Sequence, residues 1–432
     1  MTGAAESAVA RALERIGREN PRLNAFADIL GDEALAQARQ PVGDGPLAGR
    51  PFAAKDLFDI AGRPTRAGSS IRADAPPAAR DATAVARLKD AGAILLGLTH
   101  MDEFAYGFTG ENAHYGAVRN PRDPDFIAGG SSSGSAAAVG AGLVPFALGS
   151  DTNGSVRVPA ALCGVWGFKP SFGRVSRAGT TPLAWSFDHV GVLAASPEDA
   201  AAALDAIQGP DPRDPAAGLE RPDPLAAQLG APLDGLRVAV AGGHFATGGL
   251  AGVFAAVRRA ADCLGAQRSV DIADSDRAVA ASLLITSAEA ATLHFEEIRD
   301  RIGDFDRFTR ARWIAATAIP HVWVARAQQF RRRYSETVRA AFGEIDILVT
   351  PATPFPPTRI GQSQIEIDGE TVAVRGTLGR YTAPFSFLGY PALSVPIAGD
   401  PFPLGVQLVA APGKDGYLLR AAARLRDRGM AR

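Results

Sequence analysis

A run of glycine, serine and alanine, GGSSSGSAAAVGAG from Gly129 to Gly142, leaves few options for the local fold of this 432-residue chain. Glycine permits backbone conformations that other residues avoid, and serine supplies a hydroxyl that can donate, accept or attack. The small residues after the first glycines predict a helix from about Ser135 to Leu143. A run of this kind is unusual for a loop that only connects two other elements.

Taken alone, the run permits two chemical interpretations and a structural one. Residues Gly130 to Gly134 match the G-x-S-x-G nucleophile elbow of α/β-hydrolases, which would make Ser132 a nucleophile. The preceding NPRDPDFIAGG contains two prolines, however, and makes a poor central strand. A phosphate-binding loop at a helix start is the second interpretation, but the lysine of a Walker motif is missing. The third is a flexible turn beneath a helix.

The charge balance and the cysteines limit the classes of function. Lysine plus arginine (45) nearly equals aspartate plus glutamate (46), so no overall excess of positive charge points to nucleic acid or to a membrane surface. Cys163 and Cys263 lie far apart without a C-x-x-C pattern, which argues against a disulfide framework or a zinc site. The N-terminus lacks the apolar core of a signal peptide, and no uncharged apolar stretch is long enough to span a membrane. We therefore predict a soluble, cytoplasmic protein without a metal.

The chain alternates between helical and strand-like patterns. Residues 6–30 have the periodicity of an amphipathic helix, and LAGRPFAAKDLFDIAG predicts a short strand that carries Lys55. DATAVARLKDAGAILLGLTHMDEF predicts a helix, a glycine stop at Gly92 and a buried strand from Ala93 to Leu98. Such alternation favours an α/β fold with helices on the faces of a sheet.

A proline-rich connector, GPDPRDPAAGLERPDP from Gly209 to Pro224, divides the chain. Strand-like segments lie on both sides of it: VPFALGSDTNGS before, and LRVAVAGG, IDILVTPATP and YPALSVPI after. Residues from about 250 to 340 look mostly helical. Because strands occur on both sides of the connector, we predict one domain over residues 1–432, with a helical excursion at about 250–340.

A second glycine–serine stretch, GSDTNGSVRVPAALCG, changes the interpretation of the first. Together the two stretches closely resemble the signature of the amidase signature family. PFAAKDLFD resembles the lysine motif of that family and FPLGVQLVAAPGKD its C-terminal segment, so the resemblance covers nearly the whole chain. It implies the family's fold, a large mixed β-sheet between helices, and amide hydrolysis without a cofactor.

The resemblance implies a catalytic triad of Lys55, Ser131 and Ser155. Ser155 is then the nucleophile, Ser131 relays a proton after a cis peptide bond to Gly130, and Lys55 is the base. A serine hydroxyl needs a positioned base, and lysine can serve if burial keeps it neutral. None of the six histidines lies in either glycine–serine stretch, so a histidine-based triad has no obvious candidate.

The turn that carries Ser155 is expected to stabilise the tetrahedral intermediate. The resemblance implies an oxyanion hole of backbone N–H groups from Thr152, Asn153, Gly154 and Ser155. Asn153 replaces a glycine that is frequent in the family. Two interpretations stay open: its side chain contacts the substrate, or the turn only tolerates it.

Two positions bear on the choice of amide. In the largest branch of the family, which supplies the A subunit of the glutamine-dependent tRNA amidotransferase, an aspartate meets the ammonium group of glutamine and an arginine holds its carboxylate. Gly379 stands at the place of that aspartate, in TLGRYTAPFSFLGYP. Arg312, in FTRARWIAATAIPH, matches the arginine, with Arg310 as the alternative. A carboxylate clamp without an ammonium clamp implies a small acid that lacks an α-amino group.

Several segments resemble the branch of the family that hydrolyses 1-carboxybiuret, among them FDHVGVL, QGPDPRDP and AQQFRRRY. This resemblance implies release of ammonia from a small urea derivative that carries a carboxylate. It also implies a small helical partner similar to the C subunit of the tRNA amidotransferase; homodimerisation stays open. The alternatives are the glutamine amidase of a tRNA amidotransferase, a malonamidase-like enzyme and an esterase acting through Ser132.

Three further residues are candidates for substrate binding. Tyr106, in EFAYGFTGEN, and His294, in ATLHFEE, either line the pocket or only pack. Arg157 follows the expected nucleophile by two residues and either binds substrate or supports the turn. Asp188, in SFDHVG, is its expected ion-pair partner.

Overall fold

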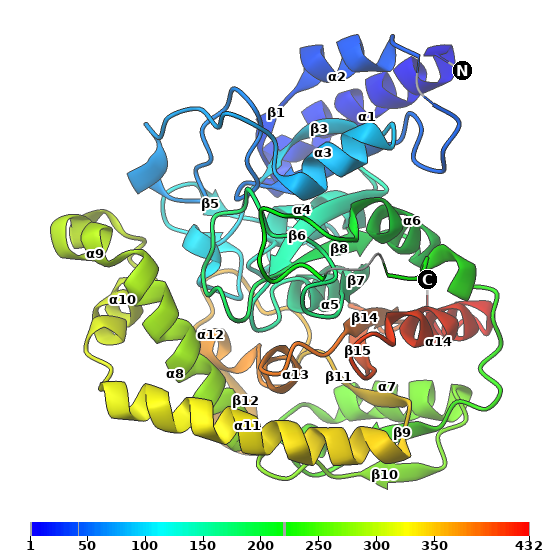
Figure 1. Ribbon diagram of the computed structural model, residues 1–432, viewed down its shortest axis with the longest axis vertical. Helices are drawn as coiled ribbons and strands as arrows, with labels where there is room; N and C mark the ends of the chain where they lie inside the picture. Colours follow the sequence, from blue (N-terminus) through cyan, green and yellow to red (C-terminus); the bar gives the residue numbers. More distant parts are fainter. Residues whose placement is uncertain (1, 42, 219–221, 432) are drawn as a thin grey trace.

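The computed structural model describes residues 2–41, 43–218 and 222–431 of the chain. A mixed β-sheet runs through the middle of the molecule with helices on both sides, which confirms the predicted α/β fold (Figure 1). Among the described residues this sheet has eleven strands. In chain order they are β1 (Phe26–Ile29), β2 (Pro51–Lys55), β3 (Ile94–Thr99), β6 (Phe146–Asp151), β7 (Trp166–Lys169), β8 (His189–Ala194), β9 (Val238–Ala241), β10 (Arg268–Val270), β11 (Ile347–Pro351), β14 (Ala392–Ile397) and β15 (Leu404–Val409).

The strands form two parallel groups joined by antiparallel pairs. Their order across the sheet is β1-β3-β2-β6-β8-β7-β14-β15-β11-β9-β10. β2 runs parallel to β3 and β6, and β9 runs parallel to β10 and β11, while the strands from β6 to β11 pair antiparallel. Because β2 and β6 are parallel neighbours, their carboxyl ends meet at the same edge of the sheet. Two ribbons lie outside it: β4 (Glu111–Asn112) with β5 (Gly116–Ala117), and β12 (Gln364–Ile367) with β13 (Glu370–Ala373).

Alternate side chains of the strands enter two different cores. In β2, Phe52 and Ala54 belong to one buried cluster and Ala53 to another, and in β6 the neighbours Phe146 and Ala147 divide in the same way. Successive side chains of a strand point to opposite faces of a sheet, so both faces are buried here. Near-continuous apolar strands such as VPFALG are typical of a sheet that is covered on both faces.

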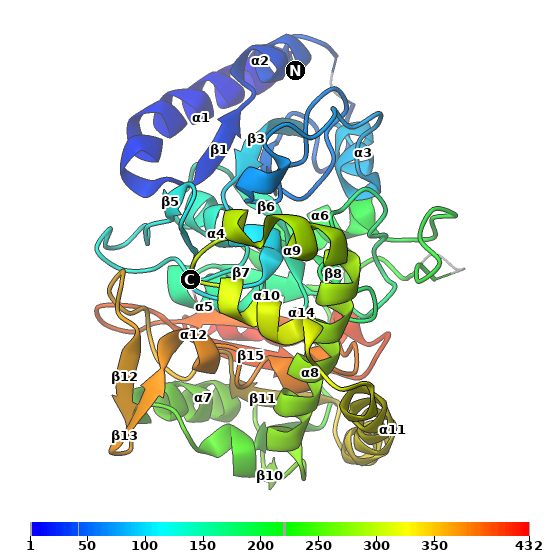
Figure 2. The same ribbon diagram turned by 90° about the vertical axis from the view of Figure 1, so that its left-hand side faces the viewer.

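Helices cover both faces of the sheet. The first cluster includes side chains from α3, α6, α7 and α14, the second includes α1, α2, α4 and α5, and a third joins α8 and α11 to β9 and β11. The helices α8 to α11 lie together on one side of the molecule (Figure 2). The described helices are α1 (Thr2–Leu23), α2 (Gly31–Ala38), α3 (Thr83–Asp90), α4 (Ser133–Gly140), α5 (Arg157–Cys163), α6 (Pro197–Ile207), α7 (Ala251–Cys263), α8 (Ser275–Leu293), α9 (Phe295–Arg301), α10 (Arg310–Thr317), α11 (His321–Glu344), α12 (Val374–Thr377), α13 (Ala383–Ser386) and α14 (Asp415–Asp427).

The first helix is shorter than predicted. It ends at Leu23, and β1 follows where the sequence pattern predicted helix up to residue 30. Pro21 lies in its last turn and Asn24 has a φ of 53°, a left-handed conformation that ends a helix and that asparagine tolerates. None of the described helices alone has the length and apolar character needed to cross a bilayer; only α8 taken together with residues 295–304, bent by 71°, reaches them.

The small-residue helix and the connector are placed close to expectation. α4 begins at Ser133, two residues earlier than predicted, and ends at Gly140. The connector contains no helix or strand in its described part, and residues 219–221 lie outside the described residues. The strands before the connector and those after it belong to the same sheet. One domain over residues 1–432 stays a prediction.

Candidate active site

Lys55 ends β2 at the edge where two parallel strands bring polar side chains together. The register pairs Ala54 with Leu148 of β6, so that Lys55 and Ser150 lie at the same end of the sheet. Lys55 Nζ donates hydrogen bonds to Ser131 Oγ at 2.7 Å and to Ser150 Oγ at 2.8 Å. The side chain is fully buried. The structure thus brings the predicted base into contact with the predicted relay serine.

The buried position of Lys55 changes its proton affinity. Burial lowers the pKa of the Lys55 ammonium from 10.5 to about 7, because the charged form loses its hydration. Three nearby carboxylates, those of Asp102, Asp151 and Asp188, act in the opposite direction and limit the shift. A substantial fraction of neutral amine therefore exists near neutral pH, and neutral amine is the form that can accept a proton.

Ser131 begins the segment that leads into α4. Its peptide bond to Gly130 is cis, as the resemblance implies. A Cβ on Gly130 would collide with Asp102 Oδ2, so the carboxylate can approach this closely only because the residue is glycine. The backbone N–H of Asp102 donates to the Ser131 carbonyl at 3.3 Å. Asp102 therefore holds the Ser131 segment in place.

Ser155 lies in the turn between β6 and α5. Gly154 has a φ of 142°, and a Cβ there would collide with Thr382 Oγ1. Thr382 Oγ1 donates to the Asn153 carbonyl at 2.7 Å, and Ser132 N donates to the Ser155 carbonyl at 3.2 Å. The N–H groups of residues 153–155 make no hydrogen bond within the described part of the chain. The turn therefore lies beside the Ser131 segment with free backbone donors.

Arg157 supports this turn from behind and does not face the pocket. Its fully buried guanidinium pairs with Asp151 at 2.8 Å, and not with Asp188 as predicted. Burial alone would raise the pKa of Asp151, but Arg157 holds it well below its usual range. The other partners of Arg157 are Gln407 Oε1, Ser386 Oγ and the Thr382 carbonyl. With its donors used inside the protein, Arg157 is a structural residue, and the substrate-binding interpretation is wrong.

Asp188 has a different role from the one predicted. Its carboxylate accepts hydrogen bonds from Thr152 Oγ1 at 2.6 Å and from the backbone N–H groups of Leu183 and Ala184. Burial raises the pKa of Asp188 despite these donors. Asp188 thus fixes the start of the turn on one side while Arg157 fixes its end on the other.

A small pocket opens beside Ser155. Helix α8 and the segment that follows the turn of residues 103–105 provide most of its other walls. Its lining consists of Ala105, Tyr106, Gly107, Phe108, Thr152, Asn153, Ser155, Leu183, Leu283, Thr286 and Arg312. A larger hollow of about 600 Å³ lies at the other end of the sheet, next to β9 and β10, and none of the predicted site residues lines it.

Arg312 and Tyr106 enter the pocket as a stacked pair. The Arg312 guanidinium lies over the Tyr106 ring, 3.9 Å from its centroid, and Nη1 donates to the Tyr106 carbonyl at 3.1 Å. The Tyr106 hydroxyl lies 2.6 Å from Ser287 Oγ. Arg310 instead donates to the carbonyls of Gly303 and Phe305. Of the two arginines weighed from the sequence, the structure therefore brings Arg312 to the pocket of Ser155.

His294 packs beside the pocket without lining it. Its ring lies 4.3 Å from the Phe104 centroid and 5.3 Å from that of Trp313. Burial lowers the pKa of His294 to about 4, so the ring is neutral at physiological pH. His294 thus packs against aromatic side chains, and it is not among the described residues that line the pocket of Ser155. In the described part of the chain, no group of three His, Cys, Asp or Glu side chains is placed to hold a metal ion.

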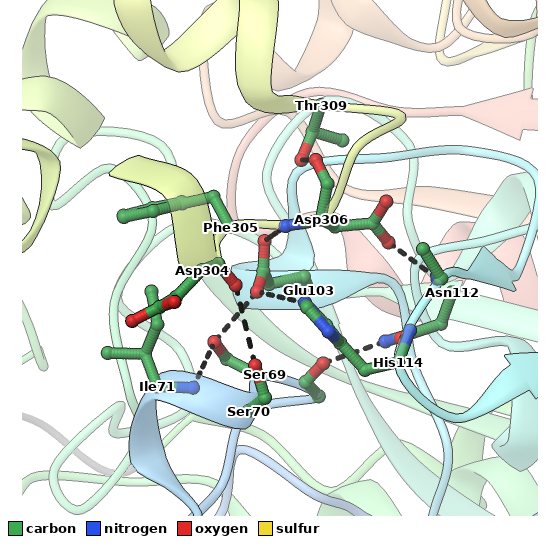
Figure 3. A network of polar contacts seen from close by, with 12 residues as sticks. Ser69, Ser70, Ile71, Glu103, Asn112, His114, Asp304, Phe305, Asp306 and Thr309 are labelled. Atoms are coloured by element: carbon green, nitrogen blue, oxygen red, sulfur yellow. Dashed lines mark hydrogen bonds and ion pairs between the residues drawn. The ribbon is translucent and has the colours of Figure 1, made fainter. Parts of the chain in front are cut away.

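A buried polar network joins the start of α10, which carries Arg312, to the segment before Tyr106 (Figure 3). Glu103 Oε2 accepts the Asp306 N–H at 2.7 Å, and Glu103 Oε1 accepts from Ser69 Oγ at 2.7 Å and lies 2.9 Å from His114 Nε2. Asp306 accepts the N–H groups of Ala113 and Phe308. Glu103 therefore fixes the helix that presents Arg312 relative to the chain that presents Tyr106.

Ser132, the candidate nucleophile of the esterase interpretation, is fully buried. Its Oγ donates to the Ser150 carbonyl at 3.2 Å and receives the Ser150 N–H at 3.3 Å. Its hydroxyl thus holds the end of β6 in place. The segment before the run is irregular and not a central strand, so the nucleophile-elbow interpretation is wrong.

Sequence reasoning missed four residues of the site. Ser150 had a usable signal, because it lies at the end of a predicted strand next to the one that carries Lys55. Asp102 and Glu103 follow a predicted buried strand, at the edge where functional groups gather. Thr286 had no signal, since nothing in the periodicity of α8 shows which helical face meets the turn of Ser155.

Comparison with known proteins identifies the family of this chain. A family model described as Amidase matches residues 7–419. The chain is 48% identical to the AtzE component of 1-carboxybiuret hydrolase from Pseudomonas sp. (strain ADP), over 98% of this chain and 94% of the relative. It is 37% identical to the A subunit of glutamyl-tRNA(Gln) amidotransferase from Akkermansia muciniphila, over 92% and 90% of the two chains.

Solved structures give the same result. The inhibitor-bound complex of an s-triazine catabolic enzyme superposes with a TM-score of 0.97 at 46% identity, covering 99% of this chain and 96% of that one. The A subunit of glutamyl-tRNA(Gln) amidotransferase from Thermotoga maritima gives 0.84 at 31% identity, covering 98% and 91%. The chain thus belongs to the amidase family and is an amide-hydrolysing enzyme.

Proposed function

We propose that this enzyme hydrolyses a small linear amide that carries a carboxylate, of the 1-carboxybiuret type, and releases ammonia. The observation that carries the proposal is the position of Arg312 in the same pocket as Ser155. Arginine binds carboxylates through two parallel hydrogen bonds, and its stacking on Tyr106 pre-orients the guanidinium. A substrate held by its carboxylate at Arg312 would present its amide carbonyl to Ser155.

In this proposal Ser155 Oγ attacks the amide carbon while its proton passes through Ser131 Oγ to the neutral Lys55 amine. The tetrahedral oxyanion is bound by the free N–H groups of residues 153–155, which removes the need to reorganise solvent as charge develops. Lys55 then returns the proton to the departing nitrogen, and ammonia leaves an acyl group on Ser155. Water, deprotonated by the same relay, hydrolyses the ester and restores the serine.

The wall of the pocket formed by Phe108 favours a substrate acid that lacks an α-amino group. A Cβ on Gly379 would lie 2.8 Å from the Phe108 ring, so Phe108 occupies the space that a longer side chain at position 379 would need. Phe108 lines the pocket, and its ring offers an ammonium group no carboxylate partner. A free glutamine would therefore leave its charged amino group unpaired in a buried site, which is costly.

We infer that the enzyme works with a small helical partner protein similar to the C subunit of the tRNA amidotransferase. The related s-triazine catabolic enzyme was solved as a protein complex. Large apolar side chains of this chain are exposed on α9 to α11, including Phe295, Ile314 and Trp323, as expected of an interaction surface.

Both cysteines are unpaired, which supports the predicted cytoplasmic location.

Ammonia release from a panel of amides tests the proposal. The panel is 1-carboxybiuret, biuret, malonamate and glutamine, assayed with and without a small helical partner protein of the inferred kind. We expect 1-carboxybiuret to give the highest kcat/KM and glutamine the lowest. A preference for glutamine would contradict the argument from Phe108 and Gly379.

Two serine variants test the assignment of the nucleophile. Ser155→Ala should abolish turnover with an unchanged thermal unfolding midpoint, because its hydroxyl reacts and does not support the fold. Ser132→Ala is the matched control: it removes a buried hydrogen-bonding hydroxyl, so it should cost about 1–3 kcal/mol of stability while retaining turnover. If Ser132→Ala abolished turnover and Ser155→Ala did not, Ser132 would be the nucleophile, as in the esterase alternative.

A further inference from the structure

The side chain of Asn153 is an unusual feature of the pocket. The residue is only 5% exposed and lies two positions before Ser155. Its Nδ2 donates to Thr286 Oγ1 of α8 at 3.1 Å, which fixes the orientation of the amide. Its Oδ1 is buried and has no hydrogen-bond partner in the described part of the chain. Buried polar atoms in folded proteins are nearly always paired, so an orphaned acceptor in a pocket needs an explanation.

The surroundings of Asn153 indicate what would pair with this oxygen. Asn153 and Thr286 line the same pocket as Ser155 and Arg312. The backbone of Asn153 belongs to the turn that offers free N–H groups beside Ser155, so its side chain starts next to the site of the reacting carbonyl. A substrate atom bonded to that carbonyl therefore comes to lie near the Asn153 amide.

We propose that Asn153 Oδ1 accepts a hydrogen bond from a substrate N–H adjacent to the scissile carbonyl, and so selects ureido compounds over their methylene analogues. The inference rests on the proposed function and adds the chemical class to it: H₂N–CO–NH–R carrying a carboxylate, as opposed to H₂N–CO–CH₂–R. A methylene at this position would leave the acceptor unpaired in the complex. A site built to pair with a polar group rejects the analogue that lacks it, because the unpaired group keeps its desolvation cost.

Thr286 is the positioning residue in this proposal. Its hydroxyl receives the Asn153 Nδ2–H and so directs the opposite end of the amide, Oδ1, away from α8. Without that bond the amide can rotate about its terminal torsion, which is broad for asparagine. The discrimination by Asn153 is therefore expected to depend on Thr286.

Allophanate and malonamate provide a matched pair of probes. Both are primary amides with one carboxylate, and they differ only by N–H or CH₂ next to the scissile carbonyl. The measured quantity is the ratio of kcat/KM for allophanate to that for malonamate, from ammonia release by the enzyme with its partner protein. Comparing this ratio between the wild type and a variant cancels the different intrinsic reactivities of the two amides.

In Asn153→Ala we expect the ratio to fall about tenfold, the equivalent of one neutral hydrogen bond. Thr286→Val should lower the ratio by less, with Asn153 still present. Leu283→Ala is the control, since Leu283 lines the same pocket one turn earlier on α8 without a polar group; it should change both kcat/KM values together and leave the ratio unchanged.

An unchanged ratio in Asn153→Ala would overturn the inference, and so would an equal fall of the ratio in Leu283→Ala. Failure of the proposed function looks different. In that case the wild-type enzyme would release no ammonia from 1-carboxybiuret or from either of the two acids, whatever residue stands at position 153.

Discussion

Lys55 is the residue whose protonation should govern the rate. Its pKa lies near 7 in the folded enzyme, below the 10.5 of a free lysine, because burial disfavours the ammonium. The base must be neutral to accept the proton from Ser131. We expect log kcat/KM to rise with a slope of about one below that pKa and to level off above it. Activity is thus lost as the pH falls, in contrast to an enzyme whose lysine acts as an acid.

Lys169 provides the matched control for this pH profile. It too is fully buried, and burial lowers its pKa to about 7, but its Nζ donates to the Pro170 carbonyl just after β7. Lys169→Met should therefore leave the inflection in place, while Lys55→Met should abolish turnover. If the inflection disappeared in Lys169→Met, the titrating group would be Lys169 and not Lys55. That result would contradict the proposal that Lys55 is the base.

At the scale of elements, the network around Glu103 should control how α10 presents Arg312. Glu103→Gln replaces one acceptor oxygen by an amide NH₂, so the side chain can no longer accept the Ser69 hydroxyl on one oxygen and the Asp306 N–H on the other. We expect KM for 1-carboxybiuret to rise several-fold, with a smaller change in kcat and little change for uncharged biuret. Steady-state kinetics on the two substrates measures this split.

Glu296 on α9 is the control for that substitution. It is exposed and pairs with Arg299 at the surface, and exposed ion pairs contribute little. Glu296→Gln should therefore change neither KM. Equal losses on charged and uncharged substrates in Glu103→Gln would show a general structural role and would contradict a specific effect on Arg312.

Local sequence patterns predicted the helices and strands better than the long-range contacts between them. The strand that carries Lys55, the small-residue helix α4 and the two serine motifs are all visible in short stretches of sequence, because each depends on neighbouring residues. The first helix was predicted too long because its apolar periodicity continues into β1 past Asn24. The bond between Glu103 and Asp306 joins residues 203 positions apart, and no periodicity specifies which loops of a large fold will meet.

At the scale of the whole molecule, the sheet predicts how the chain unfolds. β6 and β8 before the connector and β9, β11 and β14 after it share one sheet and its cores. Elements that share a core lose their packing together, so we expect one cooperative transition in calorimetry or urea. Cleavage of the proline-rich connector should leave the two fragments associated. Two separated transitions would contradict the prediction of one domain.

The contact between Phe108 and Gly379 has a consequence for how this enzyme's specificity can change over generations. A side chain at position 379 would bring its Cβ to 2.8 Å from the Phe108 ring, so the ring has to move or be replaced before a carboxylate fits there. Replacing the ring alone opens the wall without providing a new partner for a cation. The two positions are therefore coupled, and we expect an acidic residue at position 379 to be accepted more readily once position 108 carries a smaller side chain.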